Sequence, residues 1–200
     1  MPTPDWWPQA LIHLNQDPVL SPLIARYPSM PIQTDSRPFT ALARAIIGQQ
    51  ISTKAATSIW TKFTAVTPIH PQAVLNLPID KIRSCGISSK KTDYLYDLAK
   101  HFTEELEQLE WSSHTDEDIT LRLTRIHGIG RWSAQMFLIF HLSRADILPL
   151  DDLGLRRAMQ QCCMKEIIKP TRTNLLERAN IWRPYRTAAT WYLWRSLDKG

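Results

Sequence analysis

One stretch decides the fold of this chain: Leu123-Thr-Arg-Ile-His-Gly-Ile-Gly-Arg-Trp-Ser-Ala134. At its centre, Gly128-Ile-Gly130 separates two runs whose apolar residues have helical spacing. Glycine adopts positive φ without a Cβ clash, so two glycines around one apolar residue predict a tight reversal with Ile129 tucked between the helices. The second helix is expected to start at about Gly130, and a helix start beside Arg131 is a natural seat for a phosphate. An ordinary corner between two helices is the alternative.

Helical spacing of apolar residues recurs along the chain, and no alternating pattern typical of a β-strand persists. We therefore expect an all-α fold. The helices with the clearest apolar faces are predicted at Pro38–Ile51, Thr53–Phe63, Lys90–Phe102, Ile119–Ile126, Arg131–Leu142, Leu153–Gln161 and Thr187–Leu197. Their expected N-caps include Ser52, Ser88 or Ser89, and Thr115. The helix from Arg131 is apolar on nearly every side, so we expect it to be buried and central.

Composition limits the class of protein. The chain has 200 residues and 44% apolar content, enough for one large domain or two small helical lobes. A net charge of +5 suits a polyanionic partner, although it is common in proteins that bind none. Cys85, Cys162 and Cys163 are too few for a four-thiolate iron–sulfur cluster, and they indicate no disulfide framework. Without a signal peptide or a membrane-spanning run, we expect a soluble cytoplasmic protein with no membrane partner.

Two polar pairs stand at helix boundaries. The helical run in Pro38–Ile51 ends at Gly48-Gln-Gln50, so Gln49 and Gln50 occupy the break between two predicted helices, where plain solvation is the simpler interpretation. Asp151 and Asp152 precede the helix that starts at Leu153, and one of them is expected to be its N-cap.

Five blocks of the chain occur in a recognisable order: Ala45-Ile-Ile-Gly-Gln-Gln-Ile-Ser52, Gly86-Ile-Ser-Ser-Lys-Lys91, Ile129-Gly-Arg-Trp-Ser-Ala134, Leu148-Pro-Leu-Asp-Asp-Leu-Gly154 and Trp182-Arg-Pro-Tyr-Arg186. Together they resemble the helix–hairpin–helix superfamily of DNA glycosylases, and most closely the 3-methyladenine DNA glycosylase II branch. The resemblance runs from about Phe39 to Leu197 and matches the compact form without an N-terminal β-domain. It implies two interleaved helical lobes around a central DNA-binding cleft. One lobe would span about residues 38–142, and the N- and C-terminal segments would form the other.

The resemblance gives the acidic pair a catalytic role. Glycosylases extrude the damaged nucleotide from the stack, and a carboxylate stabilises the positive charge that builds on the sugar as the N-glycosidic bond breaks. In the family this aspartate stands three residues before an apolar residue and four before a basic one. Asp152 meets that pattern with Leu155 and Arg156, so it is the expected catalytic residue, with Asp151 as the runner-up.

The resemblance also bears on the reaction subtype. Trp132 stands two residues after the second hairpin glycine, where family members that cut the DNA backbone carry a Schiff-base lysine. Without an amine there, the implied enzyme is monofunctional and has no AP lyase activity. By position, Trp132 and Trp194 match aromatic walls of the base pocket, where electron-rich rings attract cationic alkylated purines. Met136 replaces another aromatic residue of that pocket. Core packing is the alternative for either tryptophan.

Further residues match the family's DNA contacts. Gln50 aligns with the wedge, the side chain that fills the gap left by the extruded nucleotide, and Gln49 is the fallback. Phosphate contacts are expected at Gly128, Gly130, Arg131, Lys90 and Lys91. Family hairpins often hold a monovalent cation, Na⁺ or K⁺, on backbone carbonyls, which by position belong to Thr124, Ile126 and Ile129. No cofactor is required for the implied reaction.

The implied activity is hydrolysis of the N-glycosidic bond of alkylated purines, chiefly 3-methyladenine and also 7-methylguanine, in duplex DNA during base excision repair. One alternative is a glycosylase for another lesion, such as hypoxanthine, ethenoadenine or mismatched thymine. Another is a non-catalytic module that binds damaged DNA, against which the retained Asp152 argues, because a carboxylate near phosphates gains nothing for binding alone. We expect a monomer with no obligate protein partner.

Overall fold

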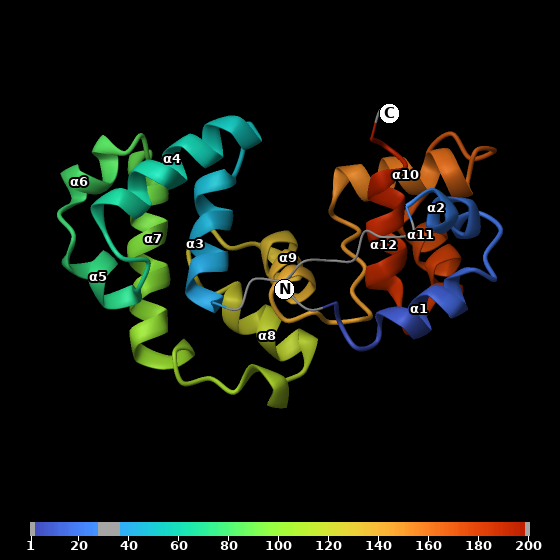
Figure 1. Cartoon of the computed structure of the whole chain (residues 1–200), viewed down its shortest axis with the longest axis horizontal. Coiled ribbons are helices and arrows are strands. Elements are labelled where there is room, and N and C mark those ends of the chain that lie inside the picture. The colour runs from blue at the N-terminus through green and yellow to red at the C-terminus, as the bar shows by residue number, and fades with distance from the viewer. Residues whose placement is uncertain (1–2, 28–36, 199–200) are drawn as a thin grey trace. The chain divides into compact units, whose positions relative to one another are not determined.

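The computed structural model describes residues 3–27 and 37–198, and within these ranges every regular element is helical (Figure 1). The predicted all-α class is confirmed. The α-helices are α1 (Trp7–Leu14), α2 (Leu20–Arg26), α3 (Pro38–Gly48), α4 (Thr53–Val66), α5 (Pro71–Asn76), α6 (Ile79–Ser84), α7 (Ser89–His101), α8 (Asp116–Leu123), α9 (Arg131–Phe140), α10 (Leu153–Cys163), α11 (Arg172–Ala179) and α12 (Arg186–Arg195). A π turn (Phe102–Leu106) and two 3₁₀ turns (Trp111–Ser113 and Asn180–Trp182) complete the described elements. None of the described helices is both long and apolar enough to cross a lipid bilayer.

Two compact units alternate along the sequence. Unit 2 covers Asp35–Phe137, and unit 1 combines Met1–Thr34 with Leu138–Gly200. Unit 1 is therefore built from both ends of the chain. The boundary lies inside α9, a few residues before the end of the lobe expected over about residues 38–142.

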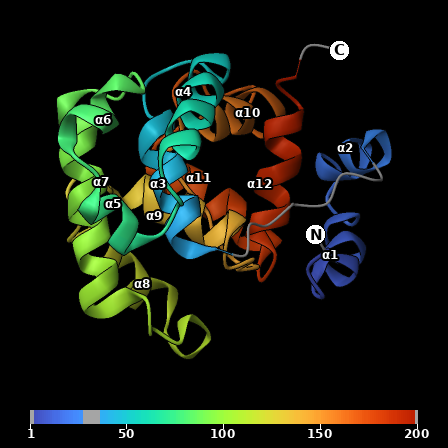
Figure 2. The same cartoon turned by 60° about the vertical axis from the view of Figure 1, so that its left-hand side comes forward.

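Unit 2 is organised around α7. This helix packs against α3, α5 and α6, and Figure 2 shows α5 and α6 beside it. Its buried positions Leu95, Leu98 and Ala99 recur at helical spacing, which gives the helix one continuous apolar face. Beyond the end of α7, Phe102 meets Phe39 of α3 edge to face, with ring centroids 5.3 Å apart. Burial of these side chains holds α3 and α7 together.

Side chains that accept a backbone N–H define where several helices begin. The capping residues are Ser52 of α4, Ser88 of α7, Thr115 of α8, Asp152 of α10 and Thr171 of α11. Each accepts the N–H of the residue three positions later, which satisfies a backbone donor that the first helical turn leaves unpaired. The caps predicted at Ser52 and Thr115 are confirmed, and Ser88 rather than Ser89 caps α7.

Four helices end earlier than their predicted bounds: α7 at His101 rather than Phe102, α8 at Leu123 rather than Ile126, α9 at Phe140 rather than Leu142, and α12 at Arg195 rather than Leu197. α3 stops at Gly48, at the break predicted for Gly48-Gln-Gln50, because Gln49 leaves the helical region with φ −57° and ψ 132°. α9 stops at Phe140 instead of Leu142. There, Ser143 takes a positive φ of 54°, and the Arg144 N–H turns back to the Leu138 carbonyl at 2.9 Å. Apolar content alone does not reveal such backbone reversals.

The hairpin between α8 and α9 forms as the sequence predicted, with one correction. Ile129 is buried, and its N–H donates to the Ile126 carbonyl at 3.1 Å. Gly128 has φ +85°, but Gly130 does not lie in the positive-φ region. Only Gly128 therefore adopts the positive φ that the sequence pattern allowed at both glycines. A Cβ on Gly128 would also lie 2.1 Å from the Tyr94 ring of α7.

Candidate active site

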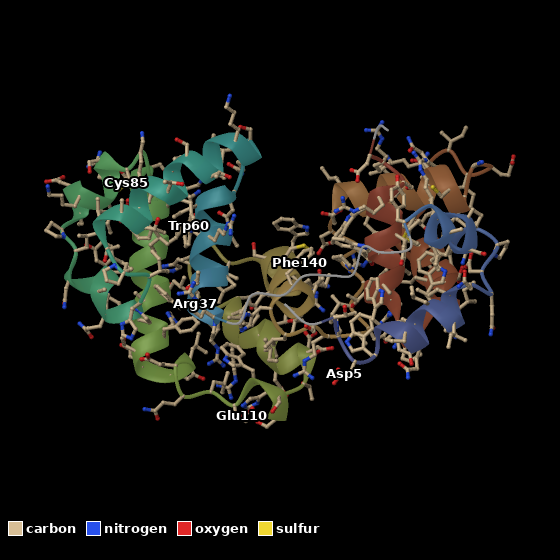
Figure 3. All side chains as sticks on the ribbon, in the orientation of Figure 1. Asp5, Arg37, Trp60, Cys85, Glu110 and Phe140 are labelled. Carbon is tan, nitrogen blue, oxygen red and sulfur yellow. The ribbon has the colours of Figure 1, made fainter. Side chains whose placement is uncertain are left out.

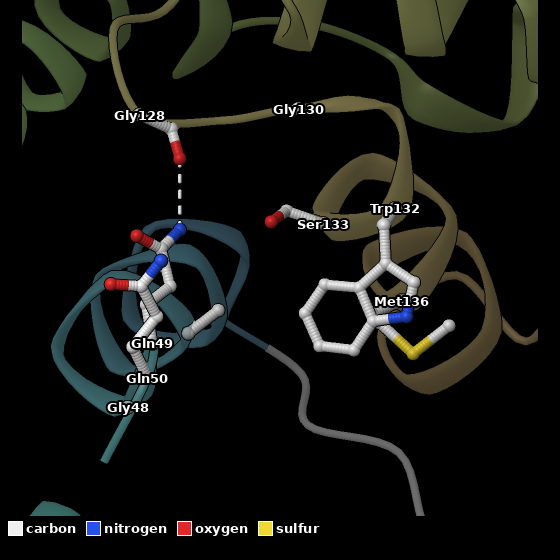
Figure 4. Close-up of a pocket in the computed structure, with 9 residues that line it drawn as sticks. Gly48, Gln49, Gln50, Gly128, Gly130, Trp132, Ser133 and Met136 are labelled. Carbon is white, nitrogen blue, oxygen red and sulfur yellow. Dashed lines mark hydrogen bonds between the residues drawn. The ribbon is translucent and has the colours of Figure 1, made fainter. Parts of the chain in front are cut away.

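A cavity of about 560 Å³ lies within unit 2 (Figure 4). Two segments far apart in the sequence line it: the end of α3 with the turn that follows, and the hairpin with the first turns of α9. The lining residues are Ala45, Gly48, Gln49, Gln50, Gly128, Gly130, Trp132, Ser133 and Met136. The fold thus brings together the glutamine pair, the hairpin glycines and the two pocket residues that were singled out on α9.

Trp132 is 41% exposed, although it stands near the start of a strongly apolar helix. Its ring and the Met136 side chain, one helical turn later, line the same cavity (Figure 4). The expectation that the helix is buried holds for Ala134, Phe137 and Leu138 but not for its first two residues, Arg131 and Trp132. Core packing is therefore not the role of Trp132.

The two glutamines have different surroundings. Gln49 is half-buried, and its Nε2 donates to the Gly128 carbonyl at 2.8 Å (Figure 4). Gln50 is exposed and has φ 57°, in the left-handed region that residues with a Cβ seldom adopt. Gln49 is thus bonded to the hairpin, whereas Gln50 faces solvent.

The predicted phosphate ligands differ in how they are engaged. Arg131 forms a two-pronged ion pair with Glu117, at 3.0 and 3.2 Å, and this hydrogen bond and charge lower the pKa of Glu117. Lys90 is exposed, with Nζ 5.8 Å from the Tyr94 ring centroid. Lys91 instead donates to the carbonyl of Ile47 at 2.7 Å and to that of Gln49 at 2.8 Å. Contact with DNA stays a prediction for all three cations.

Asp152, in unit 1, is fixed by two donors to the same oxygen. Its Oδ1 accepts the Leu155 N–H at 2.6 Å and the indole N–H of Trp194 at 2.9 Å. The Trp194 ring in turn stacks on Phe140 (labelled in Figure 3), with centroids 6.0 Å apart and planes 14° apart. A Cβ at Gly154 would lie 3.1 Å from Oδ1 and 3.6 Å from the Trp194 ring, so glycine leaves room for this contact. The carboxylate is held in one orientation.

Asp151 is placed differently. Its Oδ1 accepts from Arg172 at 3.0 Å, and both side chains are about half exposed. Such a surface ion pair contributes little to orientation. Of the two aspartates, Asp152 has the more firmly held carboxylate.

Comparison with known families decides the identity of this fold. Residues 43–184 match the family described as HhH-GPD superfamily base excision DNA repair protein. The chain belongs to the HhH-GPD superfamily. It is 34% identical over 185 residues to DNA-3-methyladenine glycosylase 1 of Schizosaccharomyces pombe, covering 87% of this chain and 78% of the relative.

Solved structures agree with the assignment to the HhH-GPD superfamily. The 3-methyladenine DNA glycosylase of Schizosaccharomyces pombe in complex with abasic DNA superimposes with a TM-score of 0.76 at 33% identity, covering 94% of this chain and 96% of that one. The DNA-3-methyladenine glycosidase of Bacillus halodurans superimposes with a TM-score of 0.79 at 28% identity, covering 92% and 86%.

In this HhH-GPD chain, the start of α12 holds the loop that leads to the acidic pair. Arg186 donates to both carboxylate oxygens of Asp146, through Nε at 2.6 Å and Nη2 at 3.0 Å. The buried Thr187 hydroxyl donates to the Arg144 carbonyl at 2.6 Å and accepts the Ile147 N–H at 3.0 Å. These bonds fix the backbone only a few residues before the candidate catalytic aspartate.

Several contributors to the site were missed from the sequence. Ala45, Gly48 and Ser133 line the cavity because their small side chains leave it open. The spacing of Ala45 and Gly48, one turn apart on α3, was the available signal. No local pattern revealed that Lys91 reaches the end of α3, or that Trp194 reaches Asp152. Those contacts join residues 42 or more positions apart.

Proposed function

We propose that this chain is a monofunctional DNA glycosylase that hydrolyses the N-glycosidic bond of alkylated purines in duplex DNA, chiefly 3-methyladenine and also 7-methylguanine. The exposed Trp132 ring in the unit 2 cavity carries the proposal, because it supplies an aromatic surface where lyase members of the family carry an amine. The names of the relatives from Schizosaccharomyces pombe and Bacillus halodurans support the same substrate class.

The chemistry suits a cationic base. Alkylation at N3 or N7 gives the purine a positive charge, which an electron-rich indole attracts. Such a base leaves readily with the electron pair of the C1′–N bond, so the enzyme need not protonate it. The Asp152 carboxylate would stabilise the positive charge that develops on the sugar. A water oxygen then bonds to C1′, and its proton passes to the carboxylate or to solvent.

The hairpin would anchor the DNA through the amides of Gly128 and Gly130, supported by Arg131 and Lys90. A monovalent cation fits the donor set of this turn, because Thr124, Ile126 and Ile129 offer neutral backbone carbonyls. The Ile126 carbonyl, which already accepts the Ile129 N–H, keeps a second lone pair. When bound, the cation would add positive charge beside the DNA phosphate.

A panel of single-lesion duplexes, together with alkylated genomic DNA, tests the proposal. We expect release of 3-methyladenine and 7-methylguanine, with strand breakage appearing only after added alkali or heat. Asp152→Asn should slow base release by about 100-fold or more, since it removes the charge that stabilises the transition state. Asp151→Asn should have a much smaller effect.

Four results would contradict the proposal. Near wild-type base release by Asp152→Asn would remove the catalytic assignment. Strand cutting without heat or alkali would show a lyase, and excision of only hypoxanthine, ethenoadenine or mismatched thymine would place the substrate elsewhere. Binding to damaged duplexes without any base release would indicate a non-catalytic module.

A further inference from the structure

The turn between α3 and α4, residues 49–52, is anchored to α7 by a lysine. The last carbonyls of an α-helix have no partner within the helix, and a cation near them is stabilised by the helix dipole. Lys91 takes that place for α3, because its Nζ donates to the carbonyls of Ile47 and Gln49. The side chain is half-buried, and burial lowers the pKa of its ammonium. A desolvated lysine with two backbone acceptors is an internal brace.

The same turn is tied to the hairpin by Gln49. Its Nε2 donates to the Gly128 carbonyl at 2.8 Å, a contact between residues 79 positions apart (Figure 4). The hairpin itself sits on α7: a Cβ on Gly128 would collide with the Tyr94 ring, and the His127 N–H donates to Asp97 Oδ2 at 2.7 Å. The turn after α3 and the hairpin are therefore both anchored on α7.

The three α7 residues that make these contacts are Lys91, Tyr94 and Asp97, spaced three apart. Residues three apart are neighbours on a helix surface, so one side of α7 carries all three contacts. Lys91 fixes the turn after α3, whereas Tyr94 and Asp97 fix the hairpin. Gln49 then joins the two loops directly.

Gln50 is the next residue of this braced turn. It is exposed, and its φ of 57° is unusual for a residue with a Cβ. Such a conformation persists only where the surrounding structure determines it. On one side of Gln50, Gln49 is held by Lys91 and Gly128, and on the other side Ser52 caps α4 through the Ala55 N–H.

We propose that Gln49 and Lys91 are positioning residues that hold Gln50 at a fixed place relative to the hairpin, so that the wedge is already formed before DNA binds. This inference rests on the proposed function for its substrate. It assigns the wedge to Gln50 and gives Gln49 a separate role.

Two substitutions remove the brace from opposite ends. Gln49→Met keeps the length of the side chain but cannot donate to Gly128, and Lys91→Met removes the cation from the end of α3. Each should slow single-turnover excision from alkylated duplex DNA by about 5- to 10-fold, as expected for loss of one or two hydrogen bonds. Lys91→Arg, which keeps a charged donor, should recover part of the rate. Gln108→Met and Lys100→Met, at exposed positions of the same unit, are the matched controls and should keep the wild-type rate.

A double-mutant cycle with Gln50→Ala separates positioning from general damage to the fold. If Gln49 and Lys91 act through Gln50, neither substitution should slow excision further once Gln50 is alanine. Additive rate losses would overturn the proposal. Wild-type rates in both Gln49→Met and Lys91→Met would also overturn it. So would a failure of both Lys91→Arg and Gln49→Asn, which keeps a shorter donor, to recover the rate, provided that both variants unfold normally on heating.

A readout without catalysis keeps this inference distinct from the proposed function. A duplex with a tetrahydrofuran abasic-site analogue opposite 2-aminopurine should brighten when saturated with wild-type protein, because the wedge unstacks the reporter. Gln49→Met and Lys91→Met should brighten it less, and Gln50→Ala least. If the variants keep this order of brightening but the wild-type protein releases no base, only the proposed function is wrong. If all variants brighten the reporter equally, only the positioning role of Gln49 and Lys91 is wrong.

Discussion

At the scale of single residues, the contact between Trp194 and Asp152 points to a role for Trp194 other than a wall of the base pocket. Trp194 was predicted as a wall of the base pocket, like Trp132. The structure places its indole N–H 2.9 Å from Asp152 Oδ1, while Phe140 stacks on the ring. A hydrogen bond to a charged group is stronger and more directional than an apolar contact. Orienting the carboxylate is therefore a role that the position of Trp194 supports.

Trp194→Phe distinguishes the two roles. Phenylalanine keeps an aromatic ring for Phe140 but removes the N–H, so Asp152 loses one of two donors to Oδ1. We expect the single-turnover excision rate to fall by about 10- to 100-fold, the range for loss of a hydrogen bond to a charged group. In an Asp152→Asn background the substitution should add little, since its effect passes through the carboxylate. A wild-type rate for Trp194→Phe would return Trp194 to the role of a pocket wall.

At the scale of elements, the hairpin shows how two identical residues can have unequal roles. Gly128 has φ +85° and lies against Tyr94, whereas an added Cβ on Gly130 would meet nothing within 4 Å. Seen in the sequence, Gly128-Ile-Gly130 is symmetric. The packing of the hairpin on α7 breaks that symmetry.

Substituting each glycine by alanine tests this difference. Gly128→Ala forces a Cβ into the Tyr94 ring at a positive φ, which should lower the unfolding temperature by about 5–10 °C. Gly130→Ala should change it by no more than about 2 °C, because the site is open and φ is ordinary. Thermal unfolding followed by circular dichroism measures both. Similar losses for the two variants would show that the conformation of Gly128 is not what makes the hairpin depend on glycine.

At the scale of the whole molecule, the helical class, the hairpin and the capping residues could be predicted because each depends on nearby residues. Ser52, Thr115 and Ile129 took the places that local spacing assigned to them. What could not be predicted depends on distant partners. The carbonyl of Ile47 near the end of α3 is bonded by Lys91, more than forty residues later in the chain, and the Asp152 carboxylate is oriented by Trp194 of α12.

Unit 1 also depends on contacts between residues far apart in the sequence, because it is assembled from the two ends of the chain. Asp17, between α1 and α2, is buried and accepts the Trp182 indole N–H at 2.7 Å. Arg178 of α11 pairs with it at 2.8 Å, and the Val19 N–H donates to it at 2.8 Å. Burial alone would raise the pKa of this carboxyl. The hydrogen bonds from Trp182, Val19 and Arg178, together with the Arg178 charge, outweigh burial and lower the pKa below its ordinary value.

The lowered pKa gives a prediction with a definite sign. A carboxyl with a lower pKa in the folded state stabilises the fold fully above its unfolded pKa, about 3.9, and loses that effect as the pH falls through the folded value. Asp17→Asn should therefore reduce the free energy of unfolding by about 3 kcal/mol at pH 7, because Arg178 loses its buried partner. The deficit should be the same at pH 5 and should shrink as the pH drops from about 4 toward 2, as wild-type Asp17 becomes protonated. Urea unfolding at pH 7, 5, 3 and 2, with Asp80→Asn on the exposed surface of α6 as control, measures the gap. If the gap stayed constant down to pH 2, the charge of Asp17 would not be what joins the two ends of the chain.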